Sequence, residues 1–275
     1  MSTRRHVARR VALALVPGPG ARGPAAGPWY RSRVTDRDAG ELIEAIPGGT
    51  ATRDVMLLVL TCGAGIVDAI SYLELGHVFT AMMTGNTVLL ALAVGQGELA
   101  AALRSTLALV TFSVGAAGGA MVLRRGRARG EWPPIVTATL AIEAVVLGVF
   151  AAMWRPEGPG ARPEALTLGL IALSGLAMGI QAAAVRHLGV PGVASTYITG
   201  TLTSLMAELV TDSASRHLRL LASVFLVYGA GALIGTVLHG RSSAVLAWLP
   251  CVCVVGVVAA GFAHHRQPGE ARSGR

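Results

Sequence analysis

The stretch Pro134–Trp154, PIVTATLAIEAVVLGVFAAMW, decides the fold of this chain. Its 21 residues hold a single ionisable side chain, Glu143. An α-helix rises about 1.5 Å per residue, so about 20 apolar residues cross the roughly 30 Å hydrocarbon core of a bilayer. The stretch therefore predicts a helix that crosses a membrane.

Seven other apolar stretches occur in the chain, and most charged residues lie between them. They are Arg53–Leu75, Phe79–Gln96, Leu99–Leu123, Ala165–Leu188, Val193–Val210, Leu218–Leu238 and Ser243–Ala263. Of the 275 residues, 53% are hydrophobic and 14% are charged, whereas soluble domains have roughly 25% charged residues. We therefore expect an all-α fold, a polytopic transmembrane helical bundle of about six to eight helical segments in a lipid bilayer.

The transmembrane domain is predicted to occupy residues 53–264. Residues 1–52 form a basic tail that we expect to be disordered, because it is rich in arginine, glycine and proline. The apolar run Val11–Val16 in this tail is shorter than the core of a signal peptide, so we expect no cleavage there. Residues 265–275 are predicted to form a polar C-terminal tail.

The arginines predict the orientation of the chain, because cytoplasmic loops of membrane proteins are rich in basic residues. The basic tail and the loop with Arg124, Arg125 and Arg127 are both expected in the cytoplasm. Three full crossings between them would place them on opposite sides. Either Phe79–Gln96 folds back without crossing, which we favour, or the tail lies outside. The same charge rule accounts for the net charge of +8, so no nucleic-acid partner is predicted.

An internal repeat relates two halves, about 53–154 and 165–263, through residues spaced 114 or 115 apart. The pairs are Gly65-Ile66 with Gly179-Ile180, Thr84-Gly85-Asn86 with Thr199-Gly200-Thr201, Arg104 with Arg219, and Val114-Gly115-Ala116 with Tyr228-Gly229-Ala230. Halves that each cross an odd number of times are inverted relative to one another, and an even number makes them parallel. Both arrangements occur in transporters.

Two segments of the first half, Gly65–Leu73 and Phe79–Thr87, resemble the signature of the YoaK-like bacterial integral membrane proteins. This is a family of unknown function, defined by domain of unknown function 1275. The resemblance covers the chain from about Arg53 to the last apolar stretch. It implies a helical bundle in the bacterial inner membrane, and it implies no reaction.

The second half adds Gly179-Ile180-Gln181 and Thr199-Gly200-Thr201, which are similar to the later motif of that family. This similarity makes Gln181 a candidate site residue. Met82 and Ala182 stand where the family usually has Asn.

Two carboxylates lie deep within apolar stretches and are candidate proton or cation sites. At about 1.5 Å per residue, Asp68 lies ~22 Å and Glu143 ~13 Å into their stretches. Ionisable groups inside a bilayer are costly, so each is a functional candidate. A buried carboxyl group that exchanges a proton near neutral pH is the basis of a proton-coupled carrier. The alternative is that each carboxyl group only hydrogen-bonds a neighbouring helix.

Three other ionisable residues, Glu74, Arg186 and His187, lie near the ends of their stretches. Side chains in such positions extend to the membrane surface, which is our interpretation of all three.

The two Thr-Gly elements are candidate ligand-binding positions, with Gly85 and Gly200 expected near the centres of short apolar stretches. Glycine there permits local unwinding, and freed carbonyl and hydroxyl groups then bind an ion or small solute. Close packing of helices through small residues is the alternative. The candidate residues of these elements are Thr84, Gly85, Asn86, Thr199, Gly200 and Thr201, and Thr196, Thr199 and Thr203 share one helix face.

No sequence signature of an enzyme is present, and neither a metal nor a cofactor is predicted. The most specific function that these observations support is secondary transport of a small solute or ion, with Asp68 as the proton or cation site. A membrane scaffold or sensor that transports nothing is the alternative. The substrate, the coupling ion and the oligomeric state do not follow from the residues.

Overall fold

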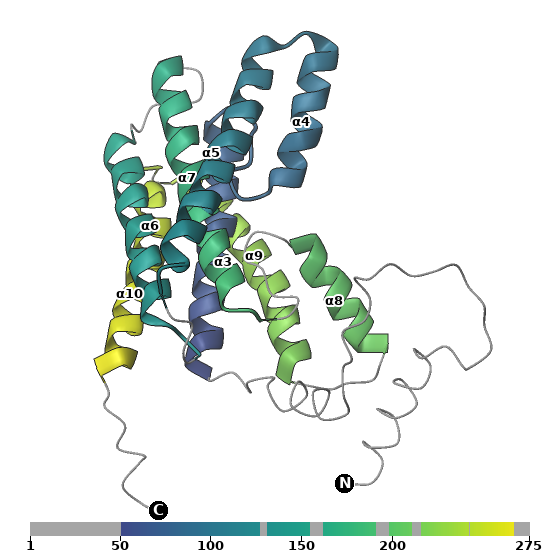
Figure 1. The fold of residues 1–275 in the computed structure, drawn as a ribbon. Coiled ribbons are helices and arrows are strands. Elements are labelled where there is room, and N and C mark those ends of the chain that lie inside the picture. The colour runs from purple at the N-terminus through teal and green to yellow at the C-terminus, as the bar shows by residue number, and fades with distance from the viewer. Residues whose placement is uncertain are drawn as a thin grey trace, which may run out of the picture. The chain divides into compact units, whose positions relative to one another are not determined.

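The computed structural model describes residues 51–126, 131–154, 162–190, 198–210, 216–241 and 243–266. Regular structure in these ranges is entirely helical, as Figure 1 shows. The described helices are α3 (Ala51–Glu74), α4 (Met83–Gln96), α5 (Leu99–Leu123), α6 (Pro134–Met153), α7 (Glu164–His187), α8 (Ile198–Val210), α9 (Arg216–His239) and α10 (Ser243–Arg266). The all-α fold is confirmed. The predicted N-terminal tail lies outside the described residues except for its last two positions, and so does the C-terminal tail from residue 267.

Six of these helices are long and apolar enough to cross a membrane, namely α3, α5, α6, α7, α9 and α10, with 20 to 25 residues each. The other two, α4 and α8, have 14 and 13 residues. Helices of that length extend only about 20 Å, which is short of the hydrocarbon core. The interpretation of Phe79–Gln96 as an incomplete crossing therefore agrees with the structure.

Close contacts at glycines show the relative directions of the long helices. A Cβ atom on Gly231 of α9 would meet the carbonyl group of Cys62 in α3, and one on Gly235 would meet Ile66 and Ala69. Residue numbers rise together along both helices, so α3 and α9 run parallel and pack along much of their length.

The helices α5 and α7 repeat this packing with the halves exchanged. Gly115 of α5 lies against Leu176 of α7, and Gly119 lies against Ile180 and Ala183. These three α7 residues are each 114 positions after the α3 residues of the first pair. Glycine at these crossings lets two backbones approach closely, which is how membrane helices pack without a hydrophobic driving force.

Each half contains three long helices and one short one, so the two halves are inverted relative to one another. The packing of α6 on α7 likewise has its counterpart in that of α10 on α3. The central helices are α3 and α7, in whose apolar windows 67% and 61% of residues are buried, against at most 44% in the other four long helices. Each central helix thus packs mainly against helices of the other half, α3 against α9 and α10, and α7 against α5 and α6 (Figure 1).

One part of the predicted repeat is wrong by two residues. The sequence pairs Gly115 with Gly229, but a Cβ on Gly229 would meet nothing, whereas Gly231 makes the backbone approach that Gly115 makes. The physical reason is that the close crossing determines which residues are equivalent, and α5 and α9 correspond with an offset of 116 residues. The predicted pair of Arg104 with Arg219 is therefore also wrong, by one residue.

We name the two ends of the bundle by residues that lie there. The Glu74 end is where α3 ends and α5 begins, and the Arg124 end is where α5 ends and α6 begins. Arg162, just before α7, contacts Glu74, so α7 begins at the Glu74 end. His265 near the end of α10 contacts Thr137 near the start of α6, so α10 ends at the Arg124 end.

Candidate functional site

The chain folds back into the bundle after α3, and we call residues 75–82 the re-entrant loop. Left-handed backbone at Gly76 (φ 86°) and His77 (φ 61°) reverses the chain. The buried residues Thr80 and Ala81 then donate their backbone N–H groups to Asp68 Oδ1, at 2.8 and 2.7 Å. Asp68 is six residues from the end of α3, about 9 Å along the helix. The loop therefore returns well below the end of α3.

Asp68 joins three parts of the structure. Its Oδ1 accepts the two loop N–H groups, and its Oδ2 accepts a hydrogen bond from the hydroxyl of Tyr228 in α9. The side chain is 3% exposed. Three residues further along α3, the hydroxyl of Ser71 lies 3.0 Å from that of Thr80. An ionised carboxyl suits this arrangement, because charge-assisted hydrogen bonds are stronger than neutral ones.

Asn86 holds the other side of the re-entrant loop. Its Oδ1 accepts the backbone N–H of Phe79 at 2.9 Å, and its Nδ2 donates to the carbonyl of the same residue. Asn86 is fully buried, whereas Thr84 is exposed. Asp68 and Asn86, predicted separately, thus bind successive residues of one loop.

The expectation that the Thr-Gly elements lie mid-stretch is wrong for both halves. Gly85 and Gly200 are each the third residue of a short helix, α4 or α8. In the first half, the non-helical backbone precedes the helix instead of interrupting it, because the re-entrant loop occupies residues 75–82. Thr201, the counterpart of Asn86, is also fully buried, and Thr199 is exposed like Thr84. The face predicted to contain Thr196 cannot be described, since that residue lies outside the described ranges.

Glu143 is a fully buried residue of α6 and takes no part in the hydrogen bonds of the re-entrant loop. Among the described residues, neither of its carboxyl oxygens has a hydrogen-bond partner. The adjacent residue, Ala144, accepts a contact from Cys251 Sγ of α10 at 3.5 Å. Glu143 is thus the predicted site residue whose burial is not offset by a described partner.

Gln181 lies between the two central helices. Its Nε2 donates to the carbonyl oxygen of Leu60 at 3.2 Å, and the side chain is fully buried. This bond connects α7 to α3 eight residues before Asp68, so Gln181 and Asp68 belong to different contacts. No three His, Cys, Asp or Glu side chains in the described ranges are grouped so that they could hold a metal ion.

The interpretation of Glu74 as a side chain extending to the membrane surface is wrong. Glu74 is 8% exposed and pairs with His239 of α9 at 2.9 Å and with Arg162 at 3.7 Å. Arg162 also donates to the Glu74 carbonyl and lies 4.4 Å from the ring centroid of Trp154. These partners come from segments distant in the sequence, so the position of Glu74 along its own stretch could not indicate the contact. The buried group joins α3, α9 and the start of α7 at the Glu74 end.

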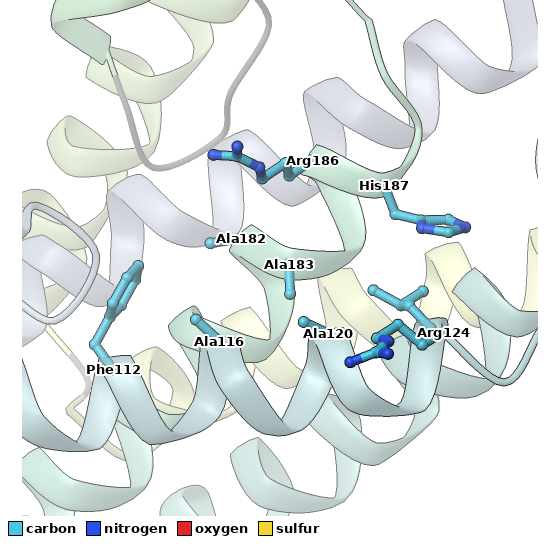
Figure 2. A pocket seen from close by; sticks show the side chains of 9 residues that line it. Phe112, Ala116, Ala120, Arg124, Ala182, Ala183, Arg186 and His187 are labelled. Carbon is cyan, nitrogen blue, oxygen red and sulfur yellow. The ribbon is translucent and has the colours of Figure 1, made fainter. Parts of the chain in front are cut away.

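A pocket of about 610 Å³ lies between α5 and α7 at the Arg124 end. Its apolar lining comprises Phe112, Ala116, Ala120, Leu123, Ala182 and Ala183. Three basic side chains complete the described lining, Arg124, Arg186 and His187. Figure 2 shows Phe112 at one end of the pocket and Arg124 with His187 at the other. Sequence reasoning missed the pocket, because alanines that line it are no different in sequence from alanines that face lipid.

Six long apolar helices, arranged as two inverted halves around buried polar contacts, define a multi-pass transmembrane protein. The family model described as "Protein of unknown function (DUF1275)" matches residues 56–260. The chain belongs to this family. It is 36% identical over 219 residues to "UPF0700 transmembrane protein YoaK" of Bacillus subtilis (strain 168), an alignment that covers 76% of this chain and 93% of that protein. No solved structure matches the chain significantly.

Proposed function

We propose that this protein is a secondary transporter of a small solute or ion that opens alternately to the two sides of the bacterial inner membrane. The observation that carries the proposal is a difference between two equivalent grooves of the inverted repeat. In the described residues, the re-entrant loop binds Asp68 of α3, whose other oxygen binds Tyr228 of α9, and the equivalent groove between α7 and α5 contains the pocket. Residues 191–197, which correspond to part of this loop, lie outside the described ranges.

The equivalence of the grooves rests on the glycine crossings. With offsets of 114 residues for α3 and 116 for α9, Asp68 corresponds to Ala182, and Tyr228 corresponds to Phe112. Asp68 holds the re-entrant loop and accepts a hydrogen bond from Tyr228, whereas Ala182 and Phe112 line the pocket. Inverted-repeat transporters alternate their access by moving one repeat or bundle against the other around a site between them. In the described part of the chain, a loop bound to Asp68 on the Glu74 side and a pocket at the Arg124 end fit one of two such states.

Asp68 is suited to couple this exchange to a proton. Its carboxylate accepts the N–H groups of Thr80 and Ala81, and protonation would remove the charge that strengthens both bonds. The re-entrant loop would then separate from α3 more readily. Glu143, buried without a described hydrogen-bond partner, is a second proton site in this proposal.

Cysteine labelling tests alternating access without knowledge of the substrate. In full-length protein whose three native cysteines are replaced by Ala, Ala182→Cys places a thiol in the pocket and Ala81→Cys places one in the buried loop. A membrane-impermeant maleimide should label the pocket thiol from the Arg124 side and the loop thiol from the Glu74 side. A bulky maleimide already bound at the pocket should suppress labelling of the loop, since both grooves cannot open together.

Ala177→Cys is the control, because this α7 residue is fully buried away from the pocket. If Ala81→Cys reacts no faster than Ala177→Cys from either side, the loop does not open. The protein would then be a static scaffold or sensor, and the transport proposal would be wrong.

A further inference from the structure

The pocket between α5 and α7 has a charge that nothing in its described lining neutralises. Arg124, Arg186 and His187 line it, and no acidic side chain does so. None of the three makes an ion pair with another described residue, and His187 Nε2 is buried without a hydrogen-bond partner there. Elsewhere in the described part, Arg104 pairs with Glu164 at 2.7 Å and Arg162 pairs with Glu74. The pocket therefore offers positive charge to a ligand.

The rest of the lining is apolar and extends toward the middle of the bundle. Phe112 lies eleven residues from Leu123, which corresponds to about 16 Å along α5. Between them, Ala116 and Ala120 face Ala182 and Ala183 across the pocket (Figure 2). Small side chains on both helices leave this space, which is large enough for a small organic molecule.

The location of the basic residues is explained in part by the helices. Arg186 and His187 lie in the last turn of α7, and Arg124 directly follows α5, where cations interact favourably with the helix dipole. Arg125 gains a similar benefit but does not line the pocket. The dipole thus accounts for cations at this end, and not for their meeting around a hollow apolar space.

We propose that this pocket binds an amphipathic organic anion, with a carboxylate or phosphate group at Arg124, Arg186 and His187 and a short apolar chain along the alanines. Arginine binds such groups through paired N–H donors, and both arginines are exposed and so accessible to a ligand. The proposal rests on the transport function insofar as it names the class of substrate. The same chemistry is offered by a free solute and by the head of an anionic lipid.

Octanoate is a suitable probe, and octanol is its uncharged analogue. The full-length protein in phosphatidylcholine nanodiscs should bind octanoate in calorimetric titration and be stabilised by it against heat, while octanol has no comparable effect. Arg186→Gln should weaken octanoate binding about tenfold, the loss expected for one charge-assisted contact. Arg125→Gln, which removes an equally exposed charge one position away from Arg124, should leave binding unchanged.

A second pair of variants tests the apolar part. Ala116→Phe fills the pocket and should abolish binding, whereas Ala117→Phe places the same ring on the neighbouring exposed position and should not. Where Ala116→Phe fails to fold, Ala182→Phe fills the pocket from α7. Equal binding of octanol and octanoate, or equal weakening by Arg125→Gln and Arg186→Gln, would overturn the proposal.

The source of the anion is distinguished by the lipid. If a lipid head occupies the pocket, phosphatidylglycerol in the nanodiscs should compete with octanoate in the unmodified protein. If a free solute is the ligand, lipid composition should have no effect on octanoate binding. Both results support an anion site. If octanoate binds but the accessibility of the two cysteines does not alternate, the anion site stands and the transport proposal is wrong. If accessibility alternates but octanoate does not bind, the transport proposal stands and the anion site is wrong.

Discussion

Asp68 is important because of the hydrogen bonds that it accepts, from two backbone N–H groups and one phenol hydroxyl, all on buried residues. A buried donor left without an acceptor costs about 1–3 kcal/mol. A carboxylate that holds a loop in this way has a structural role and, in the proposed transporter, a switching role as well. The two roles are separable by choosing the replacement.

Asp68→Ala should destabilise the protein by about 3 kcal/mol or more, because three donors lose their acceptor. Asp68→Asn should cost only about 1 kcal/mol, because the amide oxygen still accepts the loop N–H groups. Thermal unfolding of the purified protein measures both. Asp54→Ala, a change near the start of α3, is the control. An unchanged melting temperature for Asp68→Ala would show that the loop does not depend on this residue.

Glu143 presents the opposite case, since its burial is not offset by a described hydrogen bond. Glu143→Leu should therefore raise stability by about 1 kcal/mol or more, because an apolar side chain of similar size avoids the cost of burying an unpaired polar group. The measurement is again the melting temperature, with Glu98→Leu at an exposed position as control. Marked destabilisation by Glu143→Leu would instead indicate that the carboxyl has a structural partner.

At the scale of the helices, glycine crossings determine how the two halves pack. Gly115 and Gly231 occupy equivalent crossings, and at each a Cβ would collide with a backbone carbonyl of the partner helix. Gly118 lies on the same helix as Gly115 and would meet nothing. The helix α5 thus offers a tight and an open position three residues apart.

Gly115→Ala should destabilise the protein by about 1–3 kcal/mol, because the extra methyl group forces α5 and α7 apart. Gly231→Ala should have an effect of similar size if the halves are equivalent. Gly118→Ala should be neutral or slightly stabilising, since alanine favours helix. Melting temperatures of the three variants decide, and a larger loss for Gly118→Ala than for Gly115→Ala would contradict the packing described.

At the scale of the whole molecule, six crossings place both ends of the transmembrane domain at the Arg124 end. The described arginines are unevenly distributed between the ends. Those near the Arg124 end are Arg53, Arg124, Arg125, Arg186, Arg216, Arg219 and Arg266, and those near the Glu74 end are Arg104, Arg162 and Arg241. The conflict between the arginine rule and three crossings is thus resolved by the short α4. Only α3 and α5 are long enough to cross between the two basic segments.

We predict that the Arg124 end faces the cytoplasm. Green fluorescent protein fused to the C-terminus should fluoresce, and alkaline phosphatase inserted at residues 156–160 should be active outside the cytoplasm. Alkaline phosphatase inserted at residues 127–130 is the control and should be inactive. Activity at both insertions would contradict the topology.

Much of the fold could be predicted from the residues, because lipid acts on each stretch independently of the others. A run such as Pro134–Trp154 needs no partner to be recognised as a crossing, and its predicted bounds differ from those of α6 by one residue. Asp68 and Asn86 could be singled out for the same reason, since a polar group in an apolar run is conspicuous by itself.

The sequence by itself therefore determined that the chain lies in a membrane, where its helices run, and which polar residues lie within them. Only the tertiary structure decided that Asp68 meets Tyr228, that Glu74 meets His239, and that Gly115 corresponds to Gly231 and not Gly229. Solvation by lipid depends on local composition, whereas these contacts join residues far apart in the chain. Their geometry arises only when the long helices cross.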